Sequence, residues 1–329
     1  MSRRRGGGAR AVVAASLVTL AWVTCASAAA AGQRHLLIVQ GVAGSPEHAA
    51  RQSAWVQRLT AAAVGPLGLP PSSVVVLSGE ATDPERRATR ENVRAAMSRL
   101  QATAAPDDLV CLVLVGHGSY DGVDAKFNLV GPDLEAAEWA ALLRPIRAQV
   151  VVVNTASASA PFLARLAGPR RVVITATATP AQRYDTVFAE FFTAAFDDEE
   201  ADLDKDRRVS IWEAFAFASA RVTRAYEQRG QLATERALLD DTGDGVGKEA
   251  GEPGPDGAVA SRLFLDAGPV VERAAGPAAS ELLARRERLL ADLDELKRKA
   301  SFMPAADHAR ELERVLVEIA RISRALRGS

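Results

Sequence analysis

The chain has few of the residues that build metal arrays and disulfide scaffolds. Two cysteines and four histidines in 329 residues exclude a Cys/His-rich zinc array and a domain stapled by disulfides. Neither charge dominates, because 40 Lys and Arg residues face 41 Asp and Glu residues. A dedicated nucleic-acid-binding domain has a pI above about 9, so we expect no nucleic-acid partner. The content of 48% hydrophobic and 25% charged residues is typical of a globular protein.

Long apolar runs are also lacking, and the run near the N-terminus is short. Residues 11–23 are apolar, follow four arginines within the first ten residues, and precede an alanine-rich stretch. A membrane-spanning helix needs about 20 apolar residues, so an anchor is the weaker alternative. The pattern predicts a signal peptide over 1–28, cleaved after Ala28. We therefore expect an exported protein, periplasmic or extracellular, with no stable membrane span in the mature chain.

Short apolar runs alternate with helical patterns through the centre of the chain. Buried strands are predicted at 35–39, 74–77, 109–115, 150–153 and 172–175, and helices at 47–64, 89–100, 134–143, 185–196 and 210–226. Continuous β-branched strands between helices favour an α/β fold, with a mostly parallel sheet covered by helices on both faces. We expect this domain to span 33–239.

Two further regions follow that domain. Residues 240–279 are rich in Gly, Pro and Asp and predict a long loop. Residues 280–329 carry two leucine-rich stripes around Met303 and Pro304, which predict an α-helical hairpin. Each stripe lasts only about three heptads, which favours a hairpin that covers the main domain. A coiled-coil contact with a helical partner at the C-terminus is the alternative.

Two predicted strands end in residues that could carry chemistry. In open parallel sheets, ligands bind beyond the carboxyl ends of the strands. His117 lies between two glycines after the strand at 109–115, where a general base would lie, and the Gly118 amide is placed to serve as an oxyanion donor. Ser157 and Ser159 follow the strand at 150–153. Either could be a nucleophile, but capping of the next helix is the expected role of Ser159.

These two segments resemble the caspase- and legumain-like cysteine peptidases of clan CD. The segments read Leu-Val-Leu-Val-Gly-His-Gly at 112–118 and Val-Val-Val-Asn-Thr-Ala-Ser-Ala-Ser-Ala-Pro-Phe at 151–162, and the resemblance spans 34–217. It implies a caspase-like sheet, with His117 at the catalytic histidine and Gly118 at the oxyanion amide. Ser157 falls on the position of the nucleophile, which is cysteine in the family.

That departure leaves two functions open. A thiol is a few per cent ionised near neutrality and strongly nucleophilic, whereas a serine hydroxyl needs a well-placed base to take its proton. One function is a serine variant that hydrolyses peptide bonds with Ser157 and His117. The alternative is an inactive pseudo-peptidase that binds a peptide or protein in the same cleft, or acts as a calcium-stabilised scaffold.

An acidic segment at 202–213 has the spacing of an EF-hand loop. Positions 1, 3, 5 and 12 are acidic and position 9 offers a hydroxyl, so the candidate Ca²⁺ ligands are Asp202, Asp204, Asp206, Ser210 and Glu213. Position 6 of such a loop is normally glycine, and here it is Arg207. An acidic turn that caps a helix is the alternative interpretation.

Overall fold

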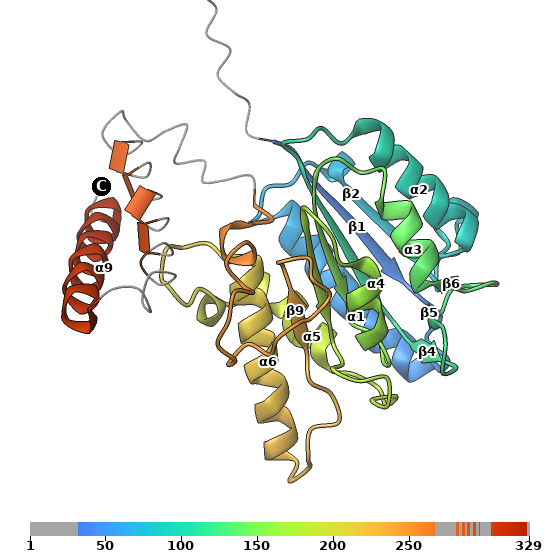
Figure 1. Ribbon diagram of the computed structural model, residues 1–329. Coiled ribbons are helices and arrows are strands. Elements are labelled where there is room, and N and C mark those ends of the chain that lie inside the picture. The colour runs from blue at the N-terminus through green and yellow to red at the C-terminus, as the bar shows by residue number, and fades with distance from the viewer. Residues whose placement is uncertain are drawn as a thin grey trace, which may run out of the picture. The chain divides into compact units, whose positions relative to one another are not determined.

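Five parallel strands and one antiparallel strand form the central sheet, in the order β2-β1-β3-β7-β8-β9 (Figure 1). The strands are β1 (Arg34–Gln40), β2 (Val74–Ser78), β3 (Leu109–Val115), β7 (Gln149–Asn154), β8 (Arg171–Thr175) and β9 (Leu238–Asp240). This computed structural model describes residues 32–266, 304–327 and parts of 281–296, so the predicted signal peptide lies outside the described residues. The predicted α/β fold with a mostly parallel sheet is confirmed.

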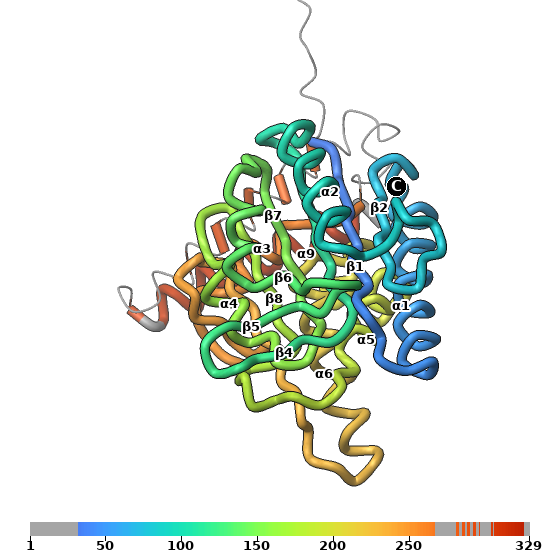
Figure 2. The backbone as a smooth tube through the Cα atoms, turned by 90° about the vertical axis from the view of Figure 1, so that its right-hand side faces the viewer, coloured from blue at the N-terminus to red at the C-terminus, as the bar shows by residue number. Residues whose placement is uncertain are grey.

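Helices cover both faces of this sheet (Figure 2). One face packs against α1 (Pro46–Val64), α5 (Phe188–Ala194) and α6 (Ile211–Gln228), and the other against α2 (Arg90–Thr103), α3 (Ala136–Leu143) and α4 (Ala160–Leu166). Alternate side chains of a strand point to opposite faces, and β3 is buried along its whole length. Cys111 and Val113 therefore join one core cluster while Leu112 and Leu114 join the other.

Two small features escaped the sequence patterns. A three-stranded antiparallel sheet of β4 (Gly118–Tyr120), β5 (Ala125–Phe127) and β6 (Leu134–Glu135) follows β3 directly. At the other end of the chain's main domain, β9 pairs antiparallel with β8. These strands have two or three residues each, too few to show an alternation of polar and apolar side chains.

The C-terminal part contains α9 (Ala305–Arg327), which confirms the second predicted helix. Most residues of the first predicted helix lie outside the described residues. The side chains that are described show the two leucine-rich stripes in contact, because Leu289 and Leu293 pack with Val315 and Ile322. Among the described residues, no helix is long and apolar enough to cross a membrane.

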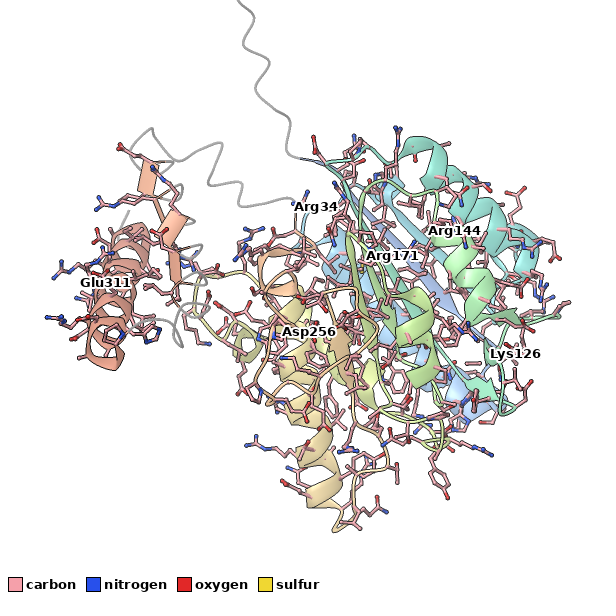
Figure 3. All side chains as sticks on the ribbon, viewed as in Figure 1. Arg34, Lys126, Arg144, Arg171, Asp256 and Glu311 are labelled. Carbon is pink, nitrogen blue, oxygen red and sulfur yellow. The ribbon has the colours of Figure 1, made fainter. Side chains whose placement is uncertain are left out.

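The parallel strands give the sheet two chemically distinct edges. Arg34 and Arg171 are the first residues of β1 and β8 and mark the amino edge (Figure 3). Burial lowers the pKa of both guanidinium groups. The opposite, carboxyl edge receives the loops that follow β1, β3, β7 and β8, and it carries His117 and Ser157.

Burial of β3 makes a testable prediction about Cys111. Its side chain is fully buried, and burial raises the pKa of the thiol to about 12. In a chain that starts after Ala28, Cys111 is the single thiol. We expect no reaction with a disulfide reagent at pH 8 in the native state and one equivalent in guanidinium, because the thiolate is the reactive form. Fast reaction of one equivalent in the native protein would show that β3 is not a central strand.

Candidate functional site

His117 follows β3 at the carboxyl edge, and both of its ring nitrogens face oxygen atoms. Nε2 lies 2.9 Å from the carbonyl oxygen of Ala43, in the loop after β1, and Nδ1 lies 3.3 Å from Oδ1 of Asp185, in the loop after β8. A carbonyl oxygen only accepts, so Nε2 carries a proton. Both ring nitrogens of His117 are therefore occupied by neighbouring oxygen atoms.

A second histidine shares the same carboxylate. Nε2 of His48 contacts Oδ2 of Asp185, while Nδ1 lies 3.0 Å from the hydroxyl of Ser45, the N-cap of α1. The two imidazole rings meet edge to face, with centroids 5.2 Å apart. Arg51, one turn further along α1, approaches Asp185 at 3.8 Å. Asp185 therefore lies among three side chains that can carry positive charge.

Ser157 lies beside Gly118, as their strand-end positions imply, but its hydroxyl is already engaged. Oγ accepts from the amide of Gly118 at 3.3 Å and donates to the carbonyl oxygen of Gly118 at 3.2 Å. The approach requires glycine, because a Cβ at position 118 would lie 2.5 Å from the carbonyl oxygen of Ser157. Ser157 is only 4% exposed. The structure thus pairs the candidate nucleophile with the candidate oxyanion donor.

Ser159 corrects one expectation. It occupies the N-cap position of α4, but its side chain makes no capping hydrogen bond. Its hydroxyl contacts Oγ1 of Thr177 at 3.1 Å and accepts from the Thr177 amide, while Thr177 Oγ1 accepts from the amide of Ala160. Thr177, from the loop after β8, therefore takes the capping role predicted for Ser159. Between the two serines, Ala158 has a left-handed backbone with φ +52°.

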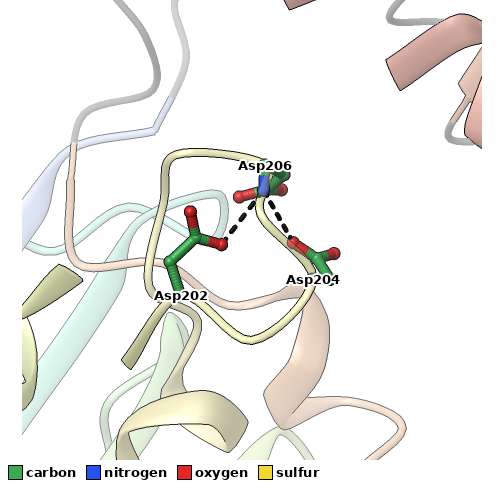
Figure 4. Close-up of side chains that lie close together, drawn as sticks. All are labelled: Asp202, Asp204 and Asp206. Carbon is green, nitrogen blue, oxygen red and sulfur yellow. Dashed lines mark hydrogen bonds between the residues drawn. The ribbon is translucent and has the colours of Figure 1, made fainter. Parts of the chain in front are cut away.

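Three aspartates of the predicted calcium loop converge (Figure 4). Carboxylate oxygens of Asp202, Asp204 and Asp206 lie within 4.8 Å of one another and could hold a metal ion. The amide of Asp206 donates to both of the other carboxylates at 3.0 Å. Arg207 adopts φ +72°, the left-handed conformation for which glycine is usual at this position.

The remaining two predicted ligands hold the loop to α6. Glu213 accepts from the amides of Leu203 and Asp204 through Oε1, and from the amide and hydroxyl of Ser210 through Oε2. Ser210 is the N-cap of α6, so this is a capping box. The oxygens of Ser210 and Glu213 are thus committed to the start of the helix and are not grouped with the three aspartates.

An arginine distant in sequence reaches the same aspartates. The guanidinium of Arg286 lies 3.1 Å from Asp206 Oδ2 and 3.2 Å from Asp204 Oδ2. Burial, together with the charges of Asp206 and Glu213, raises the pKa of Asp204 to about 6, and Arg286 opposes that rise. The carboxylates of the acidic loop therefore repel one another, and the guanidinium of Arg286 offsets part of their negative charge.

A buried carboxylate lies behind the loop that carries Asp185. Glu235 is 2% exposed and accepts from the amides of Val187 and Phe188 at 2.7 and 3.1 Å, and from the hydroxyl of Tyr226 at 3.2 Å. Burial raises the pKa of Glu235 to about 7, although these hydrogen bonds oppose the rise. Nothing in the sequence pattern identified His48, Asp185 or Glu235, because each lies in or beside a loop with no fixed spacing to its partners.

A groove lies elsewhere on the domain. It holds about 740 Å³ along β2, at the edge of the sheet between α1 and α2, and includes Val75, Asn92 and Arg99. Neither His117 nor Ser157 lines it. The groove is lined by charged side chains as well, among them Asp83, Glu85 and Arg86. We place the candidate site at the carboxyl edge because the loops after several parallel strands meet there, and ligands of open parallel sheets bind at that edge.

Comparisons with known proteins add little to this description. No family model matches the chain, and no curated protein matches its sequence. Among solved structures, the protein GSU0716 of Geobacter sulfurreducens is similar, with a TM-score of 0.43 and 15% identity. The match covers 63% of this chain and 92% of that chain. At that level of similarity no function is transferred.

The raised pKa of Glu235 predicts a pH-dependent stability. A carboxyl whose pKa rises on folding holds its proton more tightly in the folded state, so its contribution is complete below the unfolded value of 4.5 and is lost as pH rises through about 7. The full change corresponds to about 3 kcal/mol. Relative to wild type, Glu235→Gln should gain unfolding free energy between pH 5 and pH 8 in urea titrations. The exposed Glu227→Gln is the control, and parallel pH profiles for wild type and Glu235→Gln would contradict the prediction.

Proposed function

We propose that this protein is an exported relative of the caspase- and legumain-like peptidases whose cleft binds a peptide segment without hydrolysing it. The resemblance of 34–217 to that family supplies the ligand class. The parallel sheet, and the position of His117 and Ser157 at its carboxyl edge, agree with the resemblance. The proposed absence of hydrolysis rests on the two hydrogen bonds between Ser157 and Gly118.

The hydrogen bonds of Ser157 oppose nucleophilic attack in two ways. Its proton is directed to the carbonyl oxygen of Gly118, whereas a base must receive that proton before a hydroxyl attacks. The amide of Gly118 points at the Ser157 oxygen instead of at the position of a developing oxyanion. A thiol is a stronger nucleophile than a hydroxyl and depends less on such a base, so the loss of the thiol and this arrangement act in the same direction.

The environment of His117 agrees with a binding role. A general base needs a free lone pair within reach of the proton that it takes. Here Nε2 is held by Ala43 and Nδ1 faces Asp185. Neither nitrogen is therefore free to take a proton, and a bound peptide would contact Nδ1 only once Asp185 moves aside.

A serine-directed fluorophosphonate probe tests the absence of hydrolysis. We expect wild type to remain unlabelled, as judged by intact mass, just like Ser157→Ala. Peptides retained from a random library should be recovered uncut. His117→Ala should weaken their binding about 10-fold or more, which corresponds to about 1.4 kcal/mol, whereas the control His308→Ala should leave it unchanged. Labelling of wild type that Ser157→Ala abolishes would establish the serine hydrolase instead.

We further propose that the aspartate loop binds Ca²⁺ weakly and so stabilises the fold. Oxygen ligands from Asp202, Asp204 and Asp206 suit this ion, and extracellular modules bind it at about 10⁻⁴–10⁻³ M. Three carboxylates that repel one another gain most from a divalent cation. Arg286 occupies oxygens of two of them, which supports a low affinity.

Competition between Arg286 and calcium makes a direct prediction. Arg286→Gln removes the guanidinium from Asp204 and Asp206, so calorimetry should show Ca²⁺ binding strengthened several-fold. Arg285→Gln is the matched control, because its partner is Glu318. In both variants, Arg286→Gln and Arg285→Gln, millimolar Ca²⁺ should raise the melting temperature by mass action. No heat of binding in Arg286→Gln would reduce the loop to an acidic turn that caps α6.

A further inference from the structure

The segment that carries Asp185 is fixed to the domain at both ends. On one side, the carbonyl oxygen of Gln182 accepts from the amide of Ala158, beside Ser157. On the other side, the hydroxyl of Thr186 donates to the carbonyl oxygen of Thr155. Residues 182–188 therefore cross from the turn after β7 to the start of α5, and Asp185 faces the two histidines in between.

Glu235 supplies the anchor at the start of α5. Its two oxygens accept from the consecutive amides of Val187 and Phe188. These amides lie at the N-terminus of α5, where an amide has no carbonyl acceptor within the helix. Glu235 lies between α6 and β9 in the chain, so it ties the Asp185 segment to the connection between these two elements. Val187 is only two residues from Asp185, so fixing the Val187 amide restricts the positions that the Asp185 carboxylate can reach.

We propose that Glu235 is a positioning residue that holds Asp185 against His117 and His48. The inference rests on the proposed function only in taking this edge as the functional cleft. Glu235 itself contacts neither histidine. By fixing the first amides of α5, it determines whether the Asp185 carboxylate reaches both imidazole rings, and so whether His117 Nδ1 is covered or open to a ligand.

The surroundings of Glu235 make this anchor sensitive to pH. Tyr226 of α6 donates to it, Arg229 beyond the end of α6 favours its charged form, and the two amides of α5 do the same. Because burial raises the pKa of Glu235 to about 7, a fraction of the carboxyl is protonated at neutral pH. A protonated carboxyl accepts hydrogen bonds less strongly than a carboxylate. The hold on Asp185 therefore weakens as the medium becomes mildly acidic.

Nitrogen NMR of the imidazole rings tests the proposal without any ligand or turnover. The chain has four histidines, so each ring can be assigned by substitution. Asp185→Asn defines the signals that His48 and His117 give when the carboxylate is absent. At pH 8, Glu235→Gln should shift both rings toward those signals, while His35, paired with Asp108, and His308 stay unchanged. Glu227→Gln is the control and should leave all four rings as in wild type.

The outcomes separate this inference from the proposed function. Wild-type signals for His48 and His117 in Glu235→Gln, with shifted signals in Asp185→Asn, would overturn the positioning role, whether or not the cleft binds peptides. If Glu235→Gln does not fold, Tyr226→Phe removes one donor from the same carboxylate. A shift confined to His48 and His117 in that variant supports the proposal, and unchanged rings overturn it.

Discussion

The parallel alignment of β1, β3, β7 and β8 is the constraint on which the candidate site depends. Each of these strands ends at the same edge of the sheet, so the loops that follow them lie at that edge. Ala43 and His48 follow β1, His117 follows β3, Ser157 follows β7 and Asp185 follows β8. Ala43 and Asp185 are 142 positions apart in the chain, yet both contact the ring of His117.

At that edge, competition for hydrogen bonds decides what the chemistry can be. The Ser157 hydroxyl and the Gly118 amide would serve hydrolysis if each were free, yet they bond to each other. Asp185 takes the side of His117 that a base would use. The same residue types that predict a peptidase thus have their hydrogen bonds satisfied by one another.

In the acidic loop, several carboxylates likewise compete for the same positive charge. Its carboxylates gather around a point where an ion could lie, and Arg286 provides the positive charge in part. The capping box of Ser210 and Glu213 keeps the loop attached to α6 regardless of any ion.

The sequence predicts the sheet well because β-branched runs such as 109–115 and 150–153 have no alternative to a buried strand. Local spacing also predicts the convergence of Asp202, Asp204 and Asp206, while the catalytic roles of His117 and Ser157 stay predictions. The sequence misses β9, whose three residues show no period, and the contacts of Arg286, which lie about 80 positions from its partners. It assigns the capping of α4 to Ser159, because local sequence cannot show that Thr177, in the loop after β8, accepts the first amide of that helix. His48, Asp185 and Glu235 are missed for the same reason, since only tertiary structure brings their loops together.

The central claim is that the cleft holds a peptide with Ser157 kept out of reaction. A crystal structure of the wild-type protein, incubated for days with a peptide that it retains from a library, tests this most directly. The account predicts an intact peptide at the carboxyl edge, Asp185 displaced from His117, and the Ser157 hydroxyl still bonded to Gly118. A cleaved peptide, or an acyl group on Ser157 Oγ, would contradict it.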